Sequence, residues 1–287
     1  MWNGHTMPEL PEVETVRRGL ANLVEGRSLN HIQCNRKDIR FPIREGLADL
    51  AQGQNVTHVG RRGKYIILEL DGAKRMLIHL GMSGRLILGA DVMADEQFYQ
   101  RQQINPRHNH VVMSFSDAAV IYNDPRRFGM VDLLDHDGGH YLLDNLGPEP
   151  LGNEFDGDWL ATKLKGSKSS IKEKLLDQRL VVGIGNIYAS ERLYLAGINP
   201  KRKAGNISLA RLHDLAEAIR TTLQKAIEAG GSSLRDYRDV RGAPGYFQHQ
   251  FAVYDRSGDM CRRCGNSPIR KLVQSGRSTY YCVGCQR

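Results

Sequence analysis

Four of the five cysteines lie near the C-terminus as two Cys-x-x-Cys pairs, Cys261 with Cys264 and Cys282 with Cys285. A turn of this spacing places two sulfurs on one side of a loop, and two such turns supply four ligands for a tetrahedral zinc ion. A closed set of four thiolates predicts a structural ion. The alternatives are a redox-active pair or a chance pairing, and a redox pair requires a strand before the motif and a helix after it.

The segment between the two pairs predicts a hairpin, with strands over residues 270–273 and 278–281 and a turn over 274–277. A zinc ribbon results. From Arg256 onward the chain has seven Arg or Lys and one acidic residue, Asp259. A basic module that needs a metal to fold is typical of nucleic-acid binding. Arg277 adjoins the turn, where it either contacts nucleic acid or is simply solvated.

The whole chain is also basic, because 40 Lys and Arg exceed 32 Asp and Glu, which gives a net charge of +8 and a pI near 9.3. This excess favours a polyanionic partner, nucleic acid before an anionic membrane. No stretch approaches the ~20 apolar residues of a membrane span, and no secretory signal opens the chain. We therefore expect a cytosolic protein with reduced cysteines, in which the remaining cysteine, Cys34, is a small core residue.

The 287 residues suffice for two domains. A first helix is predicted from Pro11 at N1 to Gly26, with Val13, Val16 and Leu20 at helical spacing. Short β-branched or aromatic segments then predict strands of a sandwich or barrel, over residues 65–70, 75–78, 85–88, 111–115 and 119–122.

Residues 135–158 are acidic and rich in Gly and Pro, which indicates a domain boundary. Helices are expected beyond it. Ser170 and Glu173 form a capping box, Asn186 can cap a helix that stops at Gly197, and Ser208 opens a long amphipathic helix that ends before Gly230.

Six ordered motifs together resemble bacterial formamidopyrimidine-DNA glycosylases. They are MPELPEVE (7–14), RGKY (62–65), HLGMSG (79–84), DPRRFG (124–129), GIGNIY (183–188) and the paired Cys-x-x-Cys turns. The resemblance covers residues 7–287 and implies an α+β, two-lobed fold that holds damaged double-stranded DNA. Its expected parts are an N-terminal β-sandwich catalytic domain with a flanking helix (8–138), a linker (139–157), a helix–two-turn–helix domain with a lesion-reading loop (158–247) and a zinc finger (248–287). We expect a monomer.

The family's chemistry implies Pro8 as the nucleophile of a combined glycosylase and lyase. Its amine would attack the sugar, expel an oxidised or ring-opened purine, and form an iminium that drives β,δ-elimination. An α-amine has a reference pKa of about 8, against about 10.4 for lysine, so more of it is neutral at pH 7. Seven residues precede Pro8 in this sequence, which would make its nitrogen an amide. Either translation starts at Met7, or the extension is clipped, or the enzyme is inactive. We hypothesise a start at Met7, whose removal leaves a mature chain that begins at Pro8.

The resemblance assigns the remaining roles. Glu9 would be the general acid, although it could simply flank the helix start. Lys64 would hold a phosphate and assist elimination, although a lysine opening a strand is often only solvated. His79, Asn186 and Arg277 would bind phosphates around the lesion, and Arg277 would also take part in elimination. His108 and Lys168 are further candidates for DNA contact.

Chemistry on a base requires the nucleotide to leave the stack, and the resemblance implies that Met82, Arg126 and Phe128 fill the space left behind. The alternative is that Met82 and Phe128 pack in the core. Residues 232–247, with Tyr237, Tyr246 and Phe247, correspond to the lesion-reading loop. They could equally be a plain linker to the finger.

Two other functions stay open at this point. Endonuclease VIII-like enzymes act on oxidised pyrimidines, but usually have glycine after the opening Pro-Glu, where this chain has Leu10. The second is a zinc-ribbon DNA-binding protein without catalysis.

Overall fold

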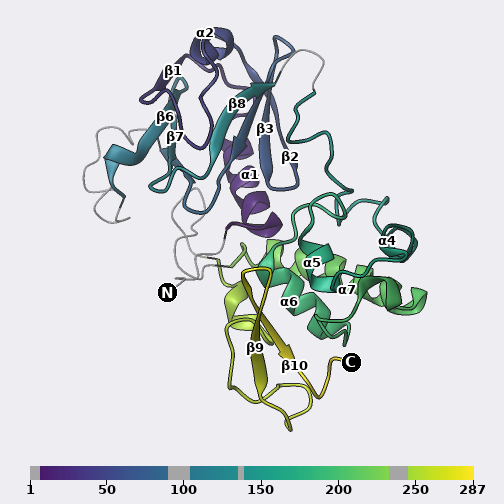
Figure 1. Cartoon of the computed structure of the whole chain (residues 1–287). Helices are drawn as coiled ribbons and strands as arrows, with labels where there is room; N and C mark the ends of the chain where they lie inside the picture. Colours follow the sequence, from purple (N-terminus) through teal and green to yellow (C-terminus); the bar gives the residue numbers. More distant parts are fainter. Residues whose placement is uncertain (1–6, 90–103, 135–138, 233–244) are drawn as a thin grey trace. The chain divides into compact units, whose positions relative to one another are not determined.

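The computed structural model describes residues 7–89, 104–134, 139–232 and 245–287, and its chain divides into two compact units (Figure 1). The first unit comprises Met1–Asp144 and Gly230–Tyr246, and the second comprises Asn145–Ala229 and Phe247–Arg287. The break after Asp144 lies within the Gly- and Pro-rich stretch. The sequence alone groups residues 230–246 with the helical part of the chain.

The first unit begins with helix α1 (Leu10–Val24). Pro11 occupies its second position, one residue later than expected, and Gly26 follows its end with a φ of +77°. Glu14 forms ion pairs with Arg17 and Arg18 on the helix and with Arg61 on a strand. Burial opposes ionisation of Glu14, but hydrogen bonds from the two helical arginines lower the net pKa of its carboxyl. These contacts attach α1 to the sheet beside it.

Two antiparallel four-stranded sheets form the body of this unit, in the strand orders β1-β6-β7-β5 and β2-β3-β4-β8. The strands are β1 (His31–Cys34), β2 (Val56–Arg62), β3 (Tyr65–Leu70), β4 (Arg75–His79), β5 (Arg85–Gly89), β6 (Asn109–Ser114), β7 (Ala119–Asn123) and β8 (Met130–Leu134). Short helices α2 (Leu47–Ala51) and η1 (Pro106–His108) lie between them in sequence. The expected β-sandwich and its five strands are thus confirmed, and β1, β2 and β8 are additional.

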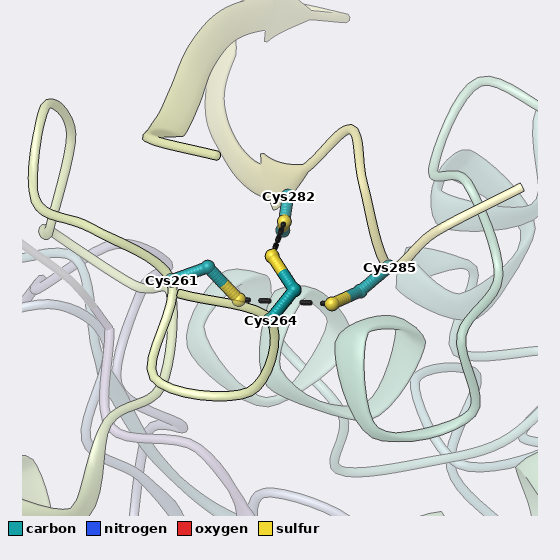
Figure 2. A group of neighbouring side chains, drawn as sticks. All are labelled: Cys261, Cys264, Cys282 and Cys285. Atoms are coloured by element: carbon teal, nitrogen blue, oxygen red, sulfur yellow. Dashed lines mark hydrogen bonds between the residues drawn. The ribbon is translucent and has the colours of Figure 1, made fainter. Parts of the chain in front are cut away.

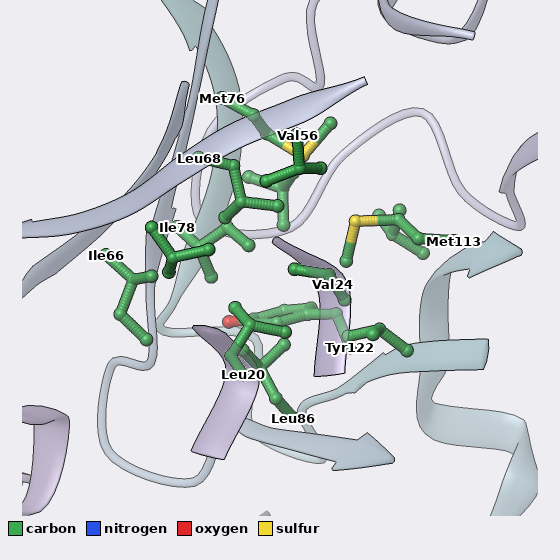
Figure 3. Packing of buried hydrophobic residues seen from close by; sticks show 14 of the residues in the cluster. Leu20, Val24, Val56, Ile66, Leu68, Met76, Ile78, Leu86, Met113 and Tyr122 are labelled. Atoms are coloured by element: carbon green, nitrogen blue, oxygen red, sulfur yellow. The ribbon is translucent and has the colours of Figure 1, made fainter. Parts of the chain in front are cut away.

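Alternation of apolar side chains along the strands builds one core between the sheets. Ile66, Leu68 and Ile78 from one sheet share it with Tyr122 from the other, and Leu20 of α1 packs among them (Figure 3). Cys34 lies outside this core: the cysteine is exposed on strand β1, so the prediction of a core cysteine was wrong. Only Ile32 of that edge strand is buried, and Cys34, although two residues further on and thus on the same face, is left exposed at the end of the strand.

The second unit is helical, followed by a hairpin. Its elements are α4 (Gly157–Leu164), α5 (Ile171–Leu176), α6 (Asn186–Leu195), η2 (Ala204–Asn206), α7 (Leu209–Glu228), η3 (Phe247–Gln250), β9 (Ile269–Gln274) and β10 (Arg277–Cys282). The Ser170–Glu173 capping box is present. Asn186 is the first residue of α6 and not its cap, because Gly185 takes the N-cap position. The amide of Asn186 therefore serves another contact.

The predicted hairpin of the finger is confirmed, with a two-residue turn at Ser275 and Gly276, whose φ angles are +46° and +73°. No helix in the described part of the chain is long and apolar enough to cross a membrane.

Candidate functional site

The four C-terminal cysteines converge in the second unit (Figure 2). Their sulfurs all lie within 4.8 Å of one another, and the pairs Cys261–Cys285 and Cys264–Cys282 are each 3.7 Å apart. A tetrahedron with zinc–sulfur bonds of about 2.3 Å has edges of about 3.8 Å, so the sulfur spacing fits zinc. The predicted four-cysteine zinc site is therefore confirmed in its geometry.

The electrostatics of the cluster also favour a cation. Burial opposes ionisation of Cys261, but hydrogen bonds from the Tyr194 hydroxyl and from backbone N–H groups lower the pKa of its thiol to about 6. Burial and the neighbouring sulfurs raise the pKa of Cys285 to about 12. The pKa of Cys264 is also lowered and that of Cys282 is also raised, so two thiolates form readily while two resist, and a bound dication removes the repulsion among them. Tyr194, from α6, was not foreseen from the sequence, because a lone tyrosine on an apolar helix face gives no signal.

Pro8 and Glu9 are both buried at the start of α1, where Glu9 is the N-cap residue. The backbone N–H of Glu9 donates to Oε2 of Glu12 at 2.8 Å, and Oε1 of Glu12 accepts the backbone N–H of Ser232 at 2.7 Å. Glu12 therefore ties the first turn of the helix to the root of the 232–247 segment. The sequence showed Glu12 only as a complement to the helix dipole; its spacing from Glu9, that of a capping box, was the available signal.

Lys64 and His79 come together through strand pairing. Lys64 follows Gly63 in the β2–β3 turn, and the next residue, Tyr65, pairs with His79 across β3 and β4 with ring centroids 4.8 Å apart. Burial, followed by the positive charges of Lys64 and Arg40, lowers the pKa of His79 to about 3. The imidazole is thus neutral at physiological pH.

The tautomer of His79 follows from its partner. The backbone N–H of Gly81 donates to Nδ1 of His79 at 3.0 Å, so the proton of the neutral ring is on Nε2. His79 can therefore offer one N–H to a phosphate oxygen without carrying charge. Sequence reasoning identified the residue but not this neutral state, which depends on burial.

The loop that carries Met82 and the loop that carries Arg126 pack against each other in the first unit. A Cβ on Gly81 would lie 2.4 Å from the backbone nitrogen of Gly129, so only glycine permits this approach. Phe128 is 43% exposed, and the Arg126 guanidinium lies 4.9 Å from its ring centroid. Met82 is half-buried. Phe128 is therefore not a core residue.

Two further candidates take different positions. His108 ends η1, and its carbonyl oxygen accepts the backbone N–H of Asp124 at 3.0 Å, so it adjoins the loop of Arg126 and Phe128. Lys168 is exposed between α4 and α5 in the second unit.

Asn186 and the residue after Arg277 are in direct contact. Nδ2 of Asn186 donates to the carbonyl oxygen of Ser278 at 2.9 Å. The same oxygen accepts from Nζ of the buried Lys172 at 3.0 Å, and Thr279 Oγ1 lies 2.7 Å from that nitrogen. Arg277 itself is exposed at the start of β10. Lys172 was missed, because one lysine among several in a helix start shows no sign of burial.

Only the ends of the expected lesion-reading loop are described, and residues 233–244, with Tyr237, lie outside the described residues. Ser232 and Tyr246 form an isolated bridge. Tyr246 is exposed, whereas Phe247 is buried with its ring 5.8 Å from that of Tyr188. Phe247 is thus a packing residue of the second unit.

Comparison with known proteins divides the chain into three matched segments. Residues 7–131 match the formamidopyrimidine-DNA glycosylase N-terminal domain, and residues 146–238 match the H2TH domain of the same enzymes. Residues 258–287 match a zinc finger found in FPG and IleRS.

Individual relatives align over nearly the full chain. Formamidopyrimidine-DNA glycosylase of Ruegeria pomeroyi is 49% identical, with 98% of this chain and all of the relative covered. Two solved structures from Lactococcus lactis superimpose well. An FPG variant bound to DNA containing Fapy-dG gives a TM-score of 0.87 at 36% identity (98% and 100% coverage), and Fpg bound to DNA containing an abasic site gives 0.86 at 37% (97% and 99%). With all three domain models matched in order, the chain belongs to the formamidopyrimidine-DNA glycosylase family.

Proposed function

We propose that this protein excises oxidised and ring-opened purines, such as 8-oxoguanine and formamidopyrimidines, from double-stranded DNA and then cleaves the resulting abasic site. The observation that carries the proposal is the full-length family match together with the placement of Pro8 and Glu9 at the buried start of α1. The Leu10 that follows Glu9 argues against the pyrimidine-specific endonuclease VIII pattern. The full-length match to glycosylases argues against a protein that only binds DNA.

Pro8 is the proposed nucleophile. A neutral secondary amine attacks the anomeric carbon of the damaged nucleotide, the C–N bond to the base breaks, and the departing base takes a proton. Glu9 is the proposed donor of that proton to the sugar or the base. The amine then loses its proton and the C1′–O4′ bond of the sugar breaks, with O4′ taking up a proton, so that the ring opens to an iminium. Its permanent positive charge withdraws electrons from the sugar and permits elimination of both flanking phosphates. This route requires a free amine, so the proposal includes a mature chain that begins at Pro8.

The proposed phosphate contacts come from both units. In the first, Lys64 supplies charge and His79 supplies a neutral Nε2–H donor. In the second, Asn186 lies at the N-terminus of α6, a position that favours anions, and Arg277 projects from the finger. His108 and Lys168 are proposed as further DNA contacts. Arg277 is also proposed to assist elimination.

Met82, Arg126 and Phe128 are the proposed space-filling residues. An exposed aromatic ring held against a guanidinium can enter a base step as a wedge, while the guanidinium can hydrogen-bond the unpaired partner base. The flexible thioether of Met82 fills irregular space.

One zinc ion would be held by Cys261, Cys264, Cys282 and Cys285, and its role is to fold the finger. We further propose a monomer in the bacterial cytoplasm, bound to nucleoid DNA.

Borohydride trapping tests the proposal. Hydride reduces the iminium to a stable amine and leaves the protein covalently joined to its DNA. A chain that begins at Pro8 should form this adduct with an abasic-site duplex, and a chain that keeps residues 1–7 should not. Adduct formation by the longer chain at the same rate, with its N-terminus verified by mass spectrometry, would refute Pro8 as the nucleophile. Duplexes with single oxidised purines or pyrimidines then separate the two substrate classes.

A further inference from the structure

Asp124 is a fully buried carboxylate beneath the loop that carries Arg126 and Phe128. Its Oδ1 accepts the Ser83 hydroxyl at 2.5 Å and the backbone N–H of Arg126 at 3.3 Å, and its Oδ2 accepts the backbone N–H of Gly129 at 2.9 Å. All three partners are donors. The position therefore requires a group that only accepts hydrogen bonds, which an ionised carboxylate does and an amide does not.

The main chain of Asp124 is fixed as firmly as its side chain. Its N–H donates to the carbonyl oxygen of His108 at 3.0 Å, and its own carbonyl oxygen accepts Nε2–H of the buried His110 at 2.8 Å. The Tyr122 hydroxyl donates to the carbonyl oxygen of His79 at 3.0 Å and lies 3.4 Å from Oδ2. A carboxylate restrained on both sides can hold the loop above it in one conformation.

The same network reaches the loop that carries Met82. Ser83 Oγ donates to Asp124 and accepts the backbone N–H of Arg126 at 3.0 Å. Gly81, on the other side of Met82, lies against the backbone of Gly129. Both neighbours of Met82 are thus held to the opposite loop, and Asp124 contacts both loops.

We propose that Asp124 is a positioning residue that keeps the two loops in register, and that this register determines discrimination among the bases opposite the lesion. The inference rests on the proposed roles of Arg126 and Phe128. Asp124 acts through Arg126, because it fixes the backbone from which the guanidinium projects. A loosened backbone would let the guanidinium satisfy several partner bases equally well.

The test is single-turnover excision of one 8-oxoguanine placed opposite each of the four bases. Asp124→Asn turns an amide N–H toward the existing donors. It should reduce the ratio of excision rates between the best and the worst partner base, called the spread below, about tenfold. The double variant Asp124→Asn/Arg126→Ala should have the same spread as Arg126→Ala alone, because Asp124 acts through the Arg126 guanidinium, which is already absent. Asp132→Asn, on β8, is the matched control and should keep the wild-type spread. A folded Asp124→Asn protein with the wild-type spread overturns the proposal.

Ser83→Ala provides a second, milder variant in case Asp124→Asn fails to fold. It removes the hydroxyl between Asp124 and Arg126 and should narrow the spread in the same direction, whereas Thr222→Val, which removes a buried hydroxyl from α7, should not. An unchanged spread in Ser83→Ala counts against the proposal. Failure of the proposed function is separately visible, since wild-type protein would then form no borohydride adduct. If Arg126→Ala alone leaves the spread intact, the positioning role falls while the enzymatic function stands.

Discussion

The side-chain amide of Asn186 donates to the carbonyl oxygen of Ser278 at 2.9 Å across 92 residues of sequence. Asn186 opens a helix, and Ser278 follows the arginine that begins the last strand of the finger. The buried ammonium of Lys172 donates to the same carbonyl oxygen, which leaves this strand little freedom at its first residues. The contact therefore brings two predicted phosphate-binding residues, Asn186 and Arg277, into one rigid group within the second unit.

Arg277→Ala should impair DNA cleavage without impairing folding. Arg277 is exposed, so we expect the free energy of unfolding to stay within about 0.5 kcal/mol of wild type. Loss of a guanidinium aimed at developing phosphate charge should slow elimination about 100-fold, and the salt dependence of DNA binding should weaken by about one phosphate contact. Denaturant unfolding and single-turnover cleavage measure both quantities. Arg270→Ala, also exposed on the hairpin, is the control, and equal losses in the two variants would contradict a specific role for Arg277.

Tyr194→Phe should weaken retention of zinc. The Tyr194 hydroxyl lies 3.3 Å from Sγ of Cys261, and only the hydroxyl can donate once the sulfur is a metal-bound thiolate. Outer hydrogen bonds of this kind typically change metal affinity about 10-fold or more, so a colorimetric chelator should withdraw zinc about tenfold faster. The phenyl ring remains under the Arg263 guanidinium, 4.4 Å from its centroid in the wild type, which limits the packing loss. Tyr281→Phe serves as control, and identical release rates would show that the hydroxyl is dispensable.

Sequence patterns predicted the β-sandwich strands, the capping box at Ser170 and the cysteine cluster, because each depends on local periodicity or on fixed spacing. The sequence patterns gave wrong predictions where the exposure or the contacts of a side chain depend on the tertiary structure. Cys34 is the last residue of an edge strand and shares a face with the buried Ile32, so alternation alone favours burial and cannot show that the end of the strand is exposed. Asn186 was expected to be the N-cap of α6 but is its first helical residue, because the sequence cannot show that the side-chain amide donates to Ser278 instead of capping the helix.

In the candidate site too, the sequence predicted the residues that motifs mark but not the properties that depend on folding. The motifs located Lys64 and His79, but their proximity follows from the pairing of β3 with β4, and the neutrality of His79 follows from its burial. The sequence predicted roles for the arginine and the phenylalanine of the DPRRFG motif but none for Asp124. Its three donors come from residues 83, 126 and 129, and the Tyr122 hydroxyl lies beside them, an arrangement that only the folded chain assembles.

Phe128→Ala should separate wedging from stability. The side chain is 43% exposed, so its loss should change the free energy of unfolding by about 0.5 kcal/mol or less. Excision from a fully paired duplex should fall, because nothing then offsets the unstacking of the lesion, while a lesion in a mismatched bubble should be excised at nearly the wild-type rate. Leu209→Ala, at a 48% exposed position on α7, is the control. Equal losses on paired and bubble substrates would argue against a wedge.

His79 should make stability depend on pH in the acidic range. Its pKa falls from 6.5 in the unfolded chain to about 3 in the folded protein, so between these values the unfolded chain binds a proton that the folded protein excludes. The free energy of unfolding should therefore rise with pH across this window, by at most about 1.4 kcal/mol per pH unit from this residue, and the contribution is complete above pH 6.5. His79→Gln should lose that slope, as measured by urea unfolding between pH 4.5 and 7, whereas His213→Gln, at an exposed position, should keep it. A slope that is unchanged in His79→Gln would mean that His79 binds as many protons in the folded protein as in the unfolded chain, and the neutral Nε2–H donor proposed for the phosphate contact would have to be abandoned.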